Sequence, residues 1–249
     1  NMITGTLKTK IVKIWKDIWA SGLTQPITVI EQLTYLMFIR SLDEKDSDAE
    51  AIENLTGQKQ KKIFPETPEG RRMRWSQFKD RDPAEIFDIV QNEVFPFIKG
   101  IGGEDATAFS QYMKDATLGF TNPAILSKTI ESLDDLYEND IKSLDMQGDL
   151  YEYMLGKLSV AGQNGQFRTP KQIRDMMVAL RNPSPDDRIC DPACGTAGFL
   201  ISAAEWIREK YPQMTDEQWE NFDTKTFSGF ETDPTMLRIS AMNLMLSGM

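Results

Sequence analysis

One stretch of the chain limits the fold more than any other. Residues 189–200 read Ile-Cys-Asp-Pro-Ala-Cys-Gly-Thr-Ala-Gly-Phe-Leu, after the turn-rich run Asn-Pro-Ser-Pro-Asp-Asp at 182–187. We predict a short strand at 188–190, a tight loop, and a helix that begins at Thr196 or Ala197 and continues to about residue 210. This unit presents backbone N–H groups to a ligand at a helix N-terminus. Gly195 permits the turn, and Gly198 lets helix and ligand approach without an intervening Cβ.

The chemistry of this loop differs from that of a dinucleotide-binding loop. It contains only Gly-x-x-Gly, with Ala193 where the G-x-G-x-x-G fingerprint places its first glycine. Asp191, at the end of the strand, would repel a pyrophosphate but suits a cationic group such as the α-ammonium of a methionine moiety. The pattern therefore favours S-adenosylmethionine (AdoMet) over NAD, which makes a dinucleotide oxidoreductase a distant alternative. An ordinary strand-to-helix turn without a ligand is the simpler alternative.

A second acidic residue follows the next predicted strand, at 226–230. Glu231 stands at the carboxyl end of that strand, where a carboxylate can accept both ribose hydroxyls of a nucleoside. A polar insertion at 211–223 separates it from the first loop. Because an acidic residue also favours the N-terminus of the following helix, Glu231 alone does not distinguish these two roles.

The rest of the chain predicts two domains of different character. Helical periodicity covers 7–19, 27–42, 84–98 and 123–137, with Asn122 as a cap, and predicts an all-helical domain over 1–147. We expect the acidic stretch 43–53 to be exposed and the loop-like region 56–83 to place Trp75 and Phe78 on the core. Residues 148–249 then predict an α/β domain, with Thr169 as the N-cap of a helix over 170–181. Only two strands of its sheet are visible, so we expect the sheet to be incomplete.

Composition narrows the class of protein. The 249 residues are 40% hydrophobic and 27% charged, as in ordinary globular proteins. No run approaches the roughly 20 apolar residues of a membrane span, and we expect a cytoplasmic protein without a membrane partner. Cys190 and Cys194 lie in one motif and the chain has no histidine, which argues against a disulfide scaffold and against a zinc site. We therefore predict no metal.

Charge bears on nucleic-acid binding in two opposite ways. The net charge of −10 argues against wrapping nucleic acid with the whole surface. Residues 59–81, however, carry eight basic and three acidic side chains. Such a segment can lie along a phosphate backbone, but it is more often a solvated loop. The sequence leaves both interpretations open.

Three segments, taken in order, resemble a known family. They are Gly-Gln-Phe-Arg-Thr-Pro at 165–170, the loop at 191–199, and Gly-Phe-Glu-Thr-Asp at 229–233. Together they resemble the AdoMet-binding motifs of amino-methylating DNA methyltransferases, most closely those of the modification (M) subunit of type I restriction-modification systems. The helical first half is similar to that family's N-terminal domain, including residues 30–42. The resemblance implies an N-terminal helical domain followed by the start of a Rossmann-like methyltransferase domain.

The resemblance also implies a reaction and a binding site. The reaction is methyl transfer from AdoMet to N6 of an adenine that is flipped out of a specific DNA sequence, with no covalent enzyme intermediate and with positioning supplying much of the rate. By analogy, residues of the first segment contact the methionine end, Asp191 and the glycine loop hold methionine, and Glu231 holds ribose. The predicted cofactor-binding residues are Gln166, Phe167, Thr169, Pro170, Asp191, Ala193, Gly195, Thr196, Gly198, Phe199 and Glu231.

One departure from the family pattern matters. The catalytic motif Asn-Pro-Pro-Phe, which binds the amino group of the flipped adenine, is absent from these 249 residues. We therefore predict no catalytic residue in this chain, expect a truncated portion of a longer subunit, and expect it to be inactive alone. The implied partners are DNA, a specificity subunit and a restriction subunit, acting in bacterial defence. The alternatives are part of a single-chain restriction-methylation enzyme, or a non-catalytic helical interaction module with a vestigial AdoMet fold.

Overall fold

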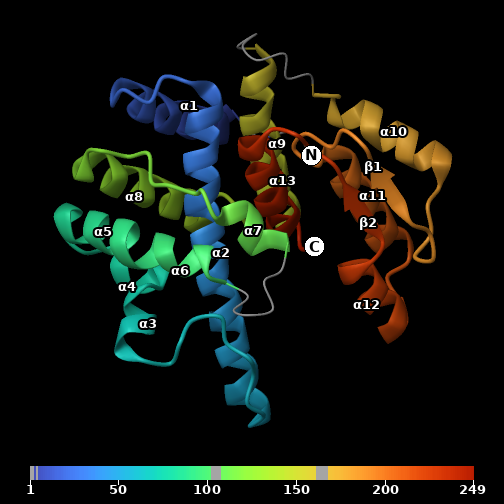
Figure 1. The fold of residues 1–249 in the computed structure, drawn as a ribbon, viewed down its shortest axis with the longest axis horizontal. Helices are drawn as coiled ribbons and strands as arrows, with labels where there is room; N and C mark the ends of the chain where they lie inside the picture. The colour runs from blue at the N-terminus through green and yellow to red at the C-terminus, as the bar shows by residue number, and fades with distance from the viewer. Residues whose placement is uncertain (1–2, 4, 102–107, 161–167) are drawn as a thin grey trace. The chain divides into compact units, whose positions relative to one another are not determined.

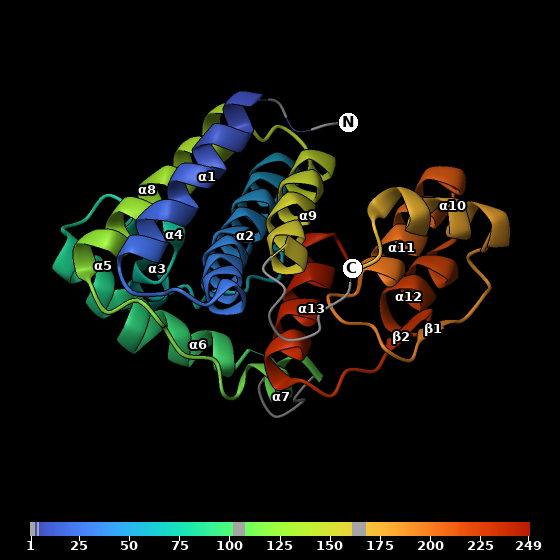
Figure 2. The same cartoon turned by 90° about the horizontal axis from the view of Figure 1, so that it is seen from above.

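The chain folds into two compact units, Met2–Lys142 and Ser143–Met249. The computed structural model describes residues 3, 5–101, 108–160 and 168–249, and Figures 1 and 2 show its helices and strands. The domain boundary that we expected between residues 147 and 148 falls inside helix α9 (Leu144–Val160). Within the described residues, no helix combines the length and the apolar character that crossing a membrane requires.

The described residues of the first unit form helices and connecting loops, with no strand among them. Its helix α1 packs against α8, and α5 packs against the same helix, while the long α2 contacts α1 and α4. The elements are α1 (Gly5–Ala20), α2 (Pro26–Thr56), α3 (Pro68–Arg72), α4 (Trp75–Phe78), α5 (Pro83–Ile89), the π-helical turn η1 (Val90–Val94), α6 (Phe95–Lys99), α7 (Ala108–Met113) and α8 (Pro123–Asn139).

Local sequence explains where the main helices begin. Pro26 lies in the first turn of α2, where its missing N–H costs nothing. The Asn122 side chain accepts a hydrogen bond from the backbone N–H of Ala124 at 2.9 Å and caps α8 as predicted. Helix α1 buries one apolar face, whereas the first half of α2 is buried on all sides. Helix α2 is therefore the centre of this unit.

Most of the acidic stretch 43–53 is exposed or half-buried, but two of its carboxylates are buried, which we did not expect. Helix α2 continues unbroken to Thr56, and Asp43 and Asp46 are only 4% and 2% exposed. Asp43 accepts a hydrogen bond from the backbone N–H of Ser76 at 2.7 Å, and Asp46 accepts from those of Ile63 and Phe64 at 2.7 and 2.9 Å. These carboxylates are buried because they bind the backbone of the following segment and hold it against α2.

The basic segment 59–81 is largely neutralised by acidic residues of its own unit. Trp75 and Phe78 are buried, which confirms their predicted place on the core, and the Trp75 indole N–H donates to Asp134 at 2.9 Å. Among the described residues, only Lys61 and Arg71 of its eight basic side chains have no ion pair. The pairs are Lys59–Glu66, Lys62–Glu53, Arg72–Glu93, Arg74–Asp43, Arg74–Glu50, Lys79–Asp134 and Arg81–Glu85.

The second unit combines helices with a small parallel sheet. Strands β1 (Ile189–Asp191) and β2 (Phe227–Gly229) pair in parallel, with Ile189 opposite Phe227 and Asp191 opposite Gly229. Helix α10 packs against α11, and α9 packs against α13. The helices are α9, α10 (Lys171–Arg181), α11 (Gly198–Lys210), α12 (Asp216–Thr224) and α13 (Pro234–Leu246).

The core of this unit lies between α11 and the sheet. Cys194, Ala197, Leu200 and Ile201 form one buried cluster, against which apolar side chains of both strands pack. The polar insertion that separates the two motifs contains helix α12, which the sequence analysis did not predict. Thr215 and Gln218 form a capping box at its start. The structure therefore confirms an α/β unit that contains the predicted strand, loop and helix of residues 189–200.

Candidate functional site

A cavity of about 140 Å³ lies at the carboxyl end of β1 and the N-terminus of α11. Seven of the residues predicted from the sequence to bind a cofactor line it, together with four others. The lining residues are Arg168, Thr169, Arg174, Asp191, Ala193, Cys194, Gly195, Thr196, Gly198, Phe199 and Met236. The structure thus brings most of the predicted positions to one cavity.

The loop after β1 is fastened to the residue that follows β2. The backbone N–H of Phe230 donates to the carbonyl of Asp191 at 3.0 Å, and the N–H of Cys194 donates to the carbonyl of Phe230 at 2.9 Å. The side chain of Asp191 also accepts from the N–H of Ala193 at 3.1 Å through Oδ1. These bonds fix the position of the Asp191 carboxylate at the cavity wall.

The loop turns into α11 through two residues in the left-handed region. Gly195 has a φ of +54°, as its predicted role in the turn requires, and Ala197 has a φ of +65°. Ala197 is the N-cap of α11 and supplies no side-chain hydrogen bond. The first N–H groups of a helix have no intrahelical acceptor, so those of α11 are left for a ligand at this end of the cavity.

Gly198 allows a close approach, but the group that approaches is a protein side chain. A Cβ at this position would lie 3.0 Å from Nε and Cζ of Arg174. Arg174, on α10, is 3% exposed, and its Nη1 donates to the carbonyl of Thr169 at 2.5 Å. A side chain at position 198 would therefore displace an arginine that holds Thr169 at the cavity.

The predicted N-cap of α10 is wrong by one residue. Helix α10 begins at Lys171, its N-cap is Pro170, and no side chain caps it. Pro170 has extended backbone angles, and its carbonyl accepts from the N–H groups of Ile173 and Arg174, so the first turn closes on Pro170 rather than on Thr169. Thr169 lines the cavity, whereas Pro170 does not.

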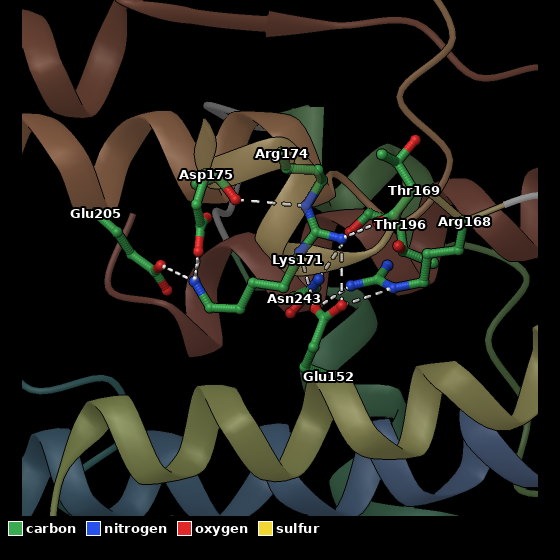
Figure 3. Close-up of polar contacts among 10 residues, drawn as sticks. Glu152, Arg168, Thr169, Lys171, Arg174, Asp175, Thr196, Glu205 and Asn243 are labelled. Atoms are coloured by element: carbon green, nitrogen blue, oxygen red, sulfur yellow. Dashed lines mark hydrogen bonds and ion pairs between the residues drawn. The ribbon is translucent and has the colours of Figure 1, made fainter. Parts of the chain in front are cut away.

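Glu152 of α9 binds both arginines of the cavity (Figure 3). Its Oε1 accepts from Arg168 Nε and Arg174 Nη1, each at 3.2 Å, and its Oε2 accepts from Arg174 Nη2 at 3.1 Å and from Arg168 Nη2. Burial by itself favours the neutral acid, but the two guanidinium groups hold the pKa of Glu152 below its ordinary value. Glu152 is therefore a carboxylate at neutral pH and connects α9 to α10.

Two further residues complete the surroundings of the loop. Asn243 of α13 is 4% exposed, and its Nδ2 donates to the carbonyl of Thr196 at 2.7 Å. Burial, together with the nearby charges of Asp191 and Glu231, raises the pKa of the Cys194 thiol. Because a protonated thiol is a poor nucleophile, Cys194 is a wall of the cavity rather than a reactive group.

Glu231 stands beside the loop without lining the cavity. It follows Phe230, the residue to which the loop is fastened, and its Oε1 accepts from the N–H groups of Thr232 and Asp233 at 2.7 and 2.9 Å. Its predicted role toward ribose stays a prediction. Gln166 and Phe167 lie outside the described residues.

Sequence reasoning missed Glu152, Arg168, Arg174 and Asn243. Glu152 lies 16 and 22 positions from its two arginines, and Asn243 lies 47 positions after Thr196. No local periodicity joins residues so far apart. The only available signal was that Arg168 adjoins Thr169 within the Gly-Gln-Phe-x-Thr-Pro segment.

Comparison with known protein families matches both parts of the chain. Residues 7–133 match the HsdM N-terminal domain, and residues 142–249 match the N-6 DNA methylase domain. The methylase subunit of the type I restriction enzyme StySPI from Salmonella potsdam is 27% identical over 246 residues. The corresponding EcoKI subunit from Escherichia coli K12 is 26% identical over 246 residues. Each alignment covers 95% of this chain and 42% of the relative, so the chain spans less than half the length of these curated relatives.

A solved structure supports the fold. The crystal structure described as a type I modification subunit from Vibrio vulnificus superposes with a TM-score of 0.77 at 22% identity. The match covers all of this chain and 55% of that one. This match shows that a helical unit is followed by an α/β unit in that protein, as in this chain.

Proposed function

Since the chain belongs to the family of modification subunits of type I restriction-modification systems, and corresponds to their N-terminal portion, we propose that its second unit binds AdoMet. The observation that carries this proposal is the cavity at the end of β1. There a fixed carboxylate, Asp191, meets the N-terminus of α11. Such a cavity has an acceptor for an ammonium group and donors for the rest of a ligand.

The residues present fit the amino-acid end of AdoMet. Oδ1 of Asp191 accepts the N–H of Ala193, and Oδ2 has no partner among the described residues. Oδ2 would bind the α-ammonium, with a charge-assisted hydrogen bond. The N–H groups at the start of α11 would donate to the ligand from the opposite side. We assign Glu231 to the ribose hydroxyls, which requires a rotation that releases its bonds to Thr232 and Asp233.

The chain's own residues would bind and orient the methyl donor. AdoMet, when bound, supplies a methyl group on a positively charged sulfonium, which needs no activation by the protein. Cys194 lies at the cavity with a raised pKa and would not compete as an acceptor of the methyl group. The protein contribution in this unit is therefore positioning, which supplies much of the rate in such a transfer.

We further propose that the methylated atom is N6 of adenine in DNA. The support is the match of residues 142–249 to the N-6 DNA methylase domain. Asn-Pro-Pro-Phe, the motif that would bind the target amine, does not occur in the 249 residues. We place it in the part of the relatives' length that this chain does not span, and expect this polypeptide alone to transfer no methyl group to DNA.

The proposed partners are DNA and the other subunits of a type I complex, a specificity subunit and a restriction subunit. The net charge of −10 and the internal ion pairs of residues 59–81 support a division of labour in which a partner reads the DNA sequence. Among the described basic residues of that segment, Lys61 and Arg71 are the ones left for a phosphate.

Calorimetric titration of AdoMet into the 249-residue chain tests the binding site. We expect binding by the wild type and a loss of at least about tenfold in affinity for Asp191→Ala, because a charge-assisted hydrogen bond is removed. Asp223→Ala, an exposed carboxylate on α12 of the same unit, is the matched control and should bind as the wild type does. Absence of binding to a folded wild-type chain would instead support the non-catalytic module.

A further inference from the structure

The arrangement of Glu152, Arg168 and Arg174 leaves one positive charge in excess. Two guanidinium groups share a single carboxylate (Figure 3). Both arginines line the cavity that Asp191 also lines. Asp191 contributes a negative charge to the wall of the same cavity. The cavity therefore holds one cationic and one anionic region, which is the charge pattern that complements a zwitterion.

The two arginines are used differently. Arg174 is 3% exposed and its donors are committed to Glu152, to the carbonyl of Thr169 and, at 3.4 Å, to Ser202. Arg168 is bound by Glu152 along one edge only, through Nε and Nη2. Arg174 thus has a structural role, whereas Arg168 has a donor that makes no hydrogen bond among the described residues.

The unused donor of Arg168 is Nη1. This nitrogen is buried and donates to no acceptor among the described residues. A buried donor without an acceptor is costly, and burial also lowers the pKa of Arg168 from its ordinary value despite Glu152. Because Arg168 lines the cavity, a side-chain rotation that turns Nη1 toward it would let an anionic ligand group satisfy this donor and compensate the excess charge.

We propose that Arg168 binds the α-carboxylate of the methionyl group, through Nη1, and that Glu152 is the positioning residue that holds Arg168 in place. This inference rests on the proposed AdoMet site and adds to it the counterpart of Asp191. Asp191 takes the ammonium and Arg168 takes the carboxylate. Arg168 occupies the unspecified position of Gly-Gln-Phe-x-Thr-Pro, so the motif itself gives it no role.

A pair of ligands isolates the proposed contact. S-adenosylhomocysteine carries the carboxylate, and its decarboxylated analogue, which retains the amine, lacks only that group. For Arg168→Gln we expect calorimetry to show at least about a tenfold loss of affinity for S-adenosylhomocysteine, the size of one charge-assisted hydrogen bond. Affinity for the decarboxylated analogue should change by less than about twofold. Arg168→Lys should recover part of the loss, because it restores the charge without the planar fork.

Control variants separate the contact from an effect on folding. Arg188→Gln removes an exposed arginine of the same unit and should bind both ligands as the wild type does. Glu152→Gln, which frees Arg168 without removing it, should weaken S-adenosylhomocysteine more than the analogue. Far-UV circular dichroism and thermal unfolding of each variant verify that it is folded.

The possible results distinguish the proposed contact of Arg168 from the alternatives. An equal loss for both ligands in folded Arg168→Gln would show that Arg168 only supports the fold, and unchanged affinity for both would show that it makes no contact. Either result overturns this inference and leaves the AdoMet site standing. If the wild type binds neither ligand, the proposed function itself fails.

Discussion

Ala197 holds the start of α11 in a backbone conformation that favours glycine. Its φ of +65° is combined with complete burial in the cluster of Cys194, Leu200 and Ile201. A left-handed conformation costs an L-residue roughly 1–2 kcal/mol, while the buried methyl group contributes about 0.8 kcal/mol. The two effects nearly cancel, so alanine is tolerated where the turn would suit glycine.

The effect of a substitution at Ala197 on stability should therefore depend on branching at Cβ more than on the size of the side chain. We expect Ala197→Gly to change the free energy of unfolding by less than about 1 kcal/mol, because the gain from relieved strain offsets the lost methyl group. Ala197→Val should lose at least about 2 kcal/mol, since a β-branched residue strongly resists this φ. Urea unfolding of the two variants measures both values. A Val variant as stable as the Gly variant would contradict the strained conformation.

The rate at which the Cys194 thiol is alkylated should depend on both the pH and the presence of a bound ligand. Because burial and the charges of Asp191 and Glu231 raise its pKa, the thiolate forms only at higher pH and iodoacetamide should modify it slowly. Exposed Cys190 is the internal reference. Asp191→Asn removes one of the raising charges, so the Cys194 rate should increase at pH 8, as peptide mass spectrometry can measure. Saturating S-adenosylhomocysteine should slow the reaction in the wild type; equal rates with and without ligand would argue against a ligand at this wall.

At the residue scale, the sequence predicted the loop residues that would bind a ligand. It did not predict the residues that keep those loop residues in position. Gly195 and Asp191 were identified because turn geometry and charge at a strand end are local properties. Arg174 and Asn243 were missed because Glu152 and Thr196, the residues that they bind, are 22 and 47 positions away in the sequence. The role of Gly198 was predicted as a close approach, but only the structure identifies Arg174 as the group that approaches.

At the scale of elements, Glu152 ties α9 to α10 and to residue 168. Its pKa is lowered in the folded state, so its contribution to stability is present above its ordinary pKa and is lost as pH falls through the folded value. We expect Glu152→Gln to lose about 3 kcal/mol of unfolding free energy at pH 7, because it leaves buried guanidinium groups without a carboxylate. As pH falls through this lowered folded pKa the wild type becomes protonated too, and the difference between wild type and variant should shrink.

Glu205→Gln is the matched control for this prediction. Glu205 pairs with Lys171 at 2.9 Å in the same unit, but both side chains are about one-third exposed, at 34% and 31%. Its loss should cost at most about 1 kcal/mol. Urea titrations at pH 7 and at a series of lower pH values compare the two variants. Equal losses of unfolding free energy for Glu152→Gln and Glu205→Gln would show that the buried pairing stabilises the fold no more than the exposed one.

The segment 59–81 offers a second contrast between buried and exposed charge. Arg74 is 13% exposed and pairs with Asp43 and with Glu50, whereas Arg71 is exposed and has no ion pair among the described residues. Arg74→Gln should destabilise the chain by at least about 2 kcal/mol, the cost of leaving a buried carboxylate without its partner. Arg71→Gln should change stability by less than about 0.5 kcal/mol. Thermal unfolding measures both; an Arg74→Gln variant as stable as the wild type would show that pairing with Asp43 and Glu50 does not stabilise the fold.

Element types were predicted more securely than their lengths. Helix α2 extends through the acidic stretch because Asp43 and Asp46 bind backbone N–H groups that arrive from residues 63–76, which no local pattern reveals. The region 84–98 follows helical periodicity, yet it contains the π-helical turn η1 between α5 and α6. Local patterns identify a helix, and tertiary partners decide where it ends.

At the scale of the molecule, the chain is a helical unit followed by the α/β unit that carries the cavity. The sequence predicted this order from the change in character after residue 140, and the matches at 7–133 and 142–249 agree with it. The described residues show two strands, as the sequence did. The chain spans 42% of its curated relatives, and the function that we propose for this part is to bind a methyl donor.

A crystal structure of the 249-residue chain with S-adenosylhomocysteine tests that claim most directly. We expect electron density for the amino-acid end in the cavity at the end of β1. Its ammonium should lie within 3.2 Å of Asp191, the limit of an N–H···O hydrogen bond, with its carboxylate at Arg168 and its ribose toward Glu231. Density at another place, or a well-ordered empty cavity at saturating ligand, would contradict the account and make residues 191–198 a turn between strand and helix.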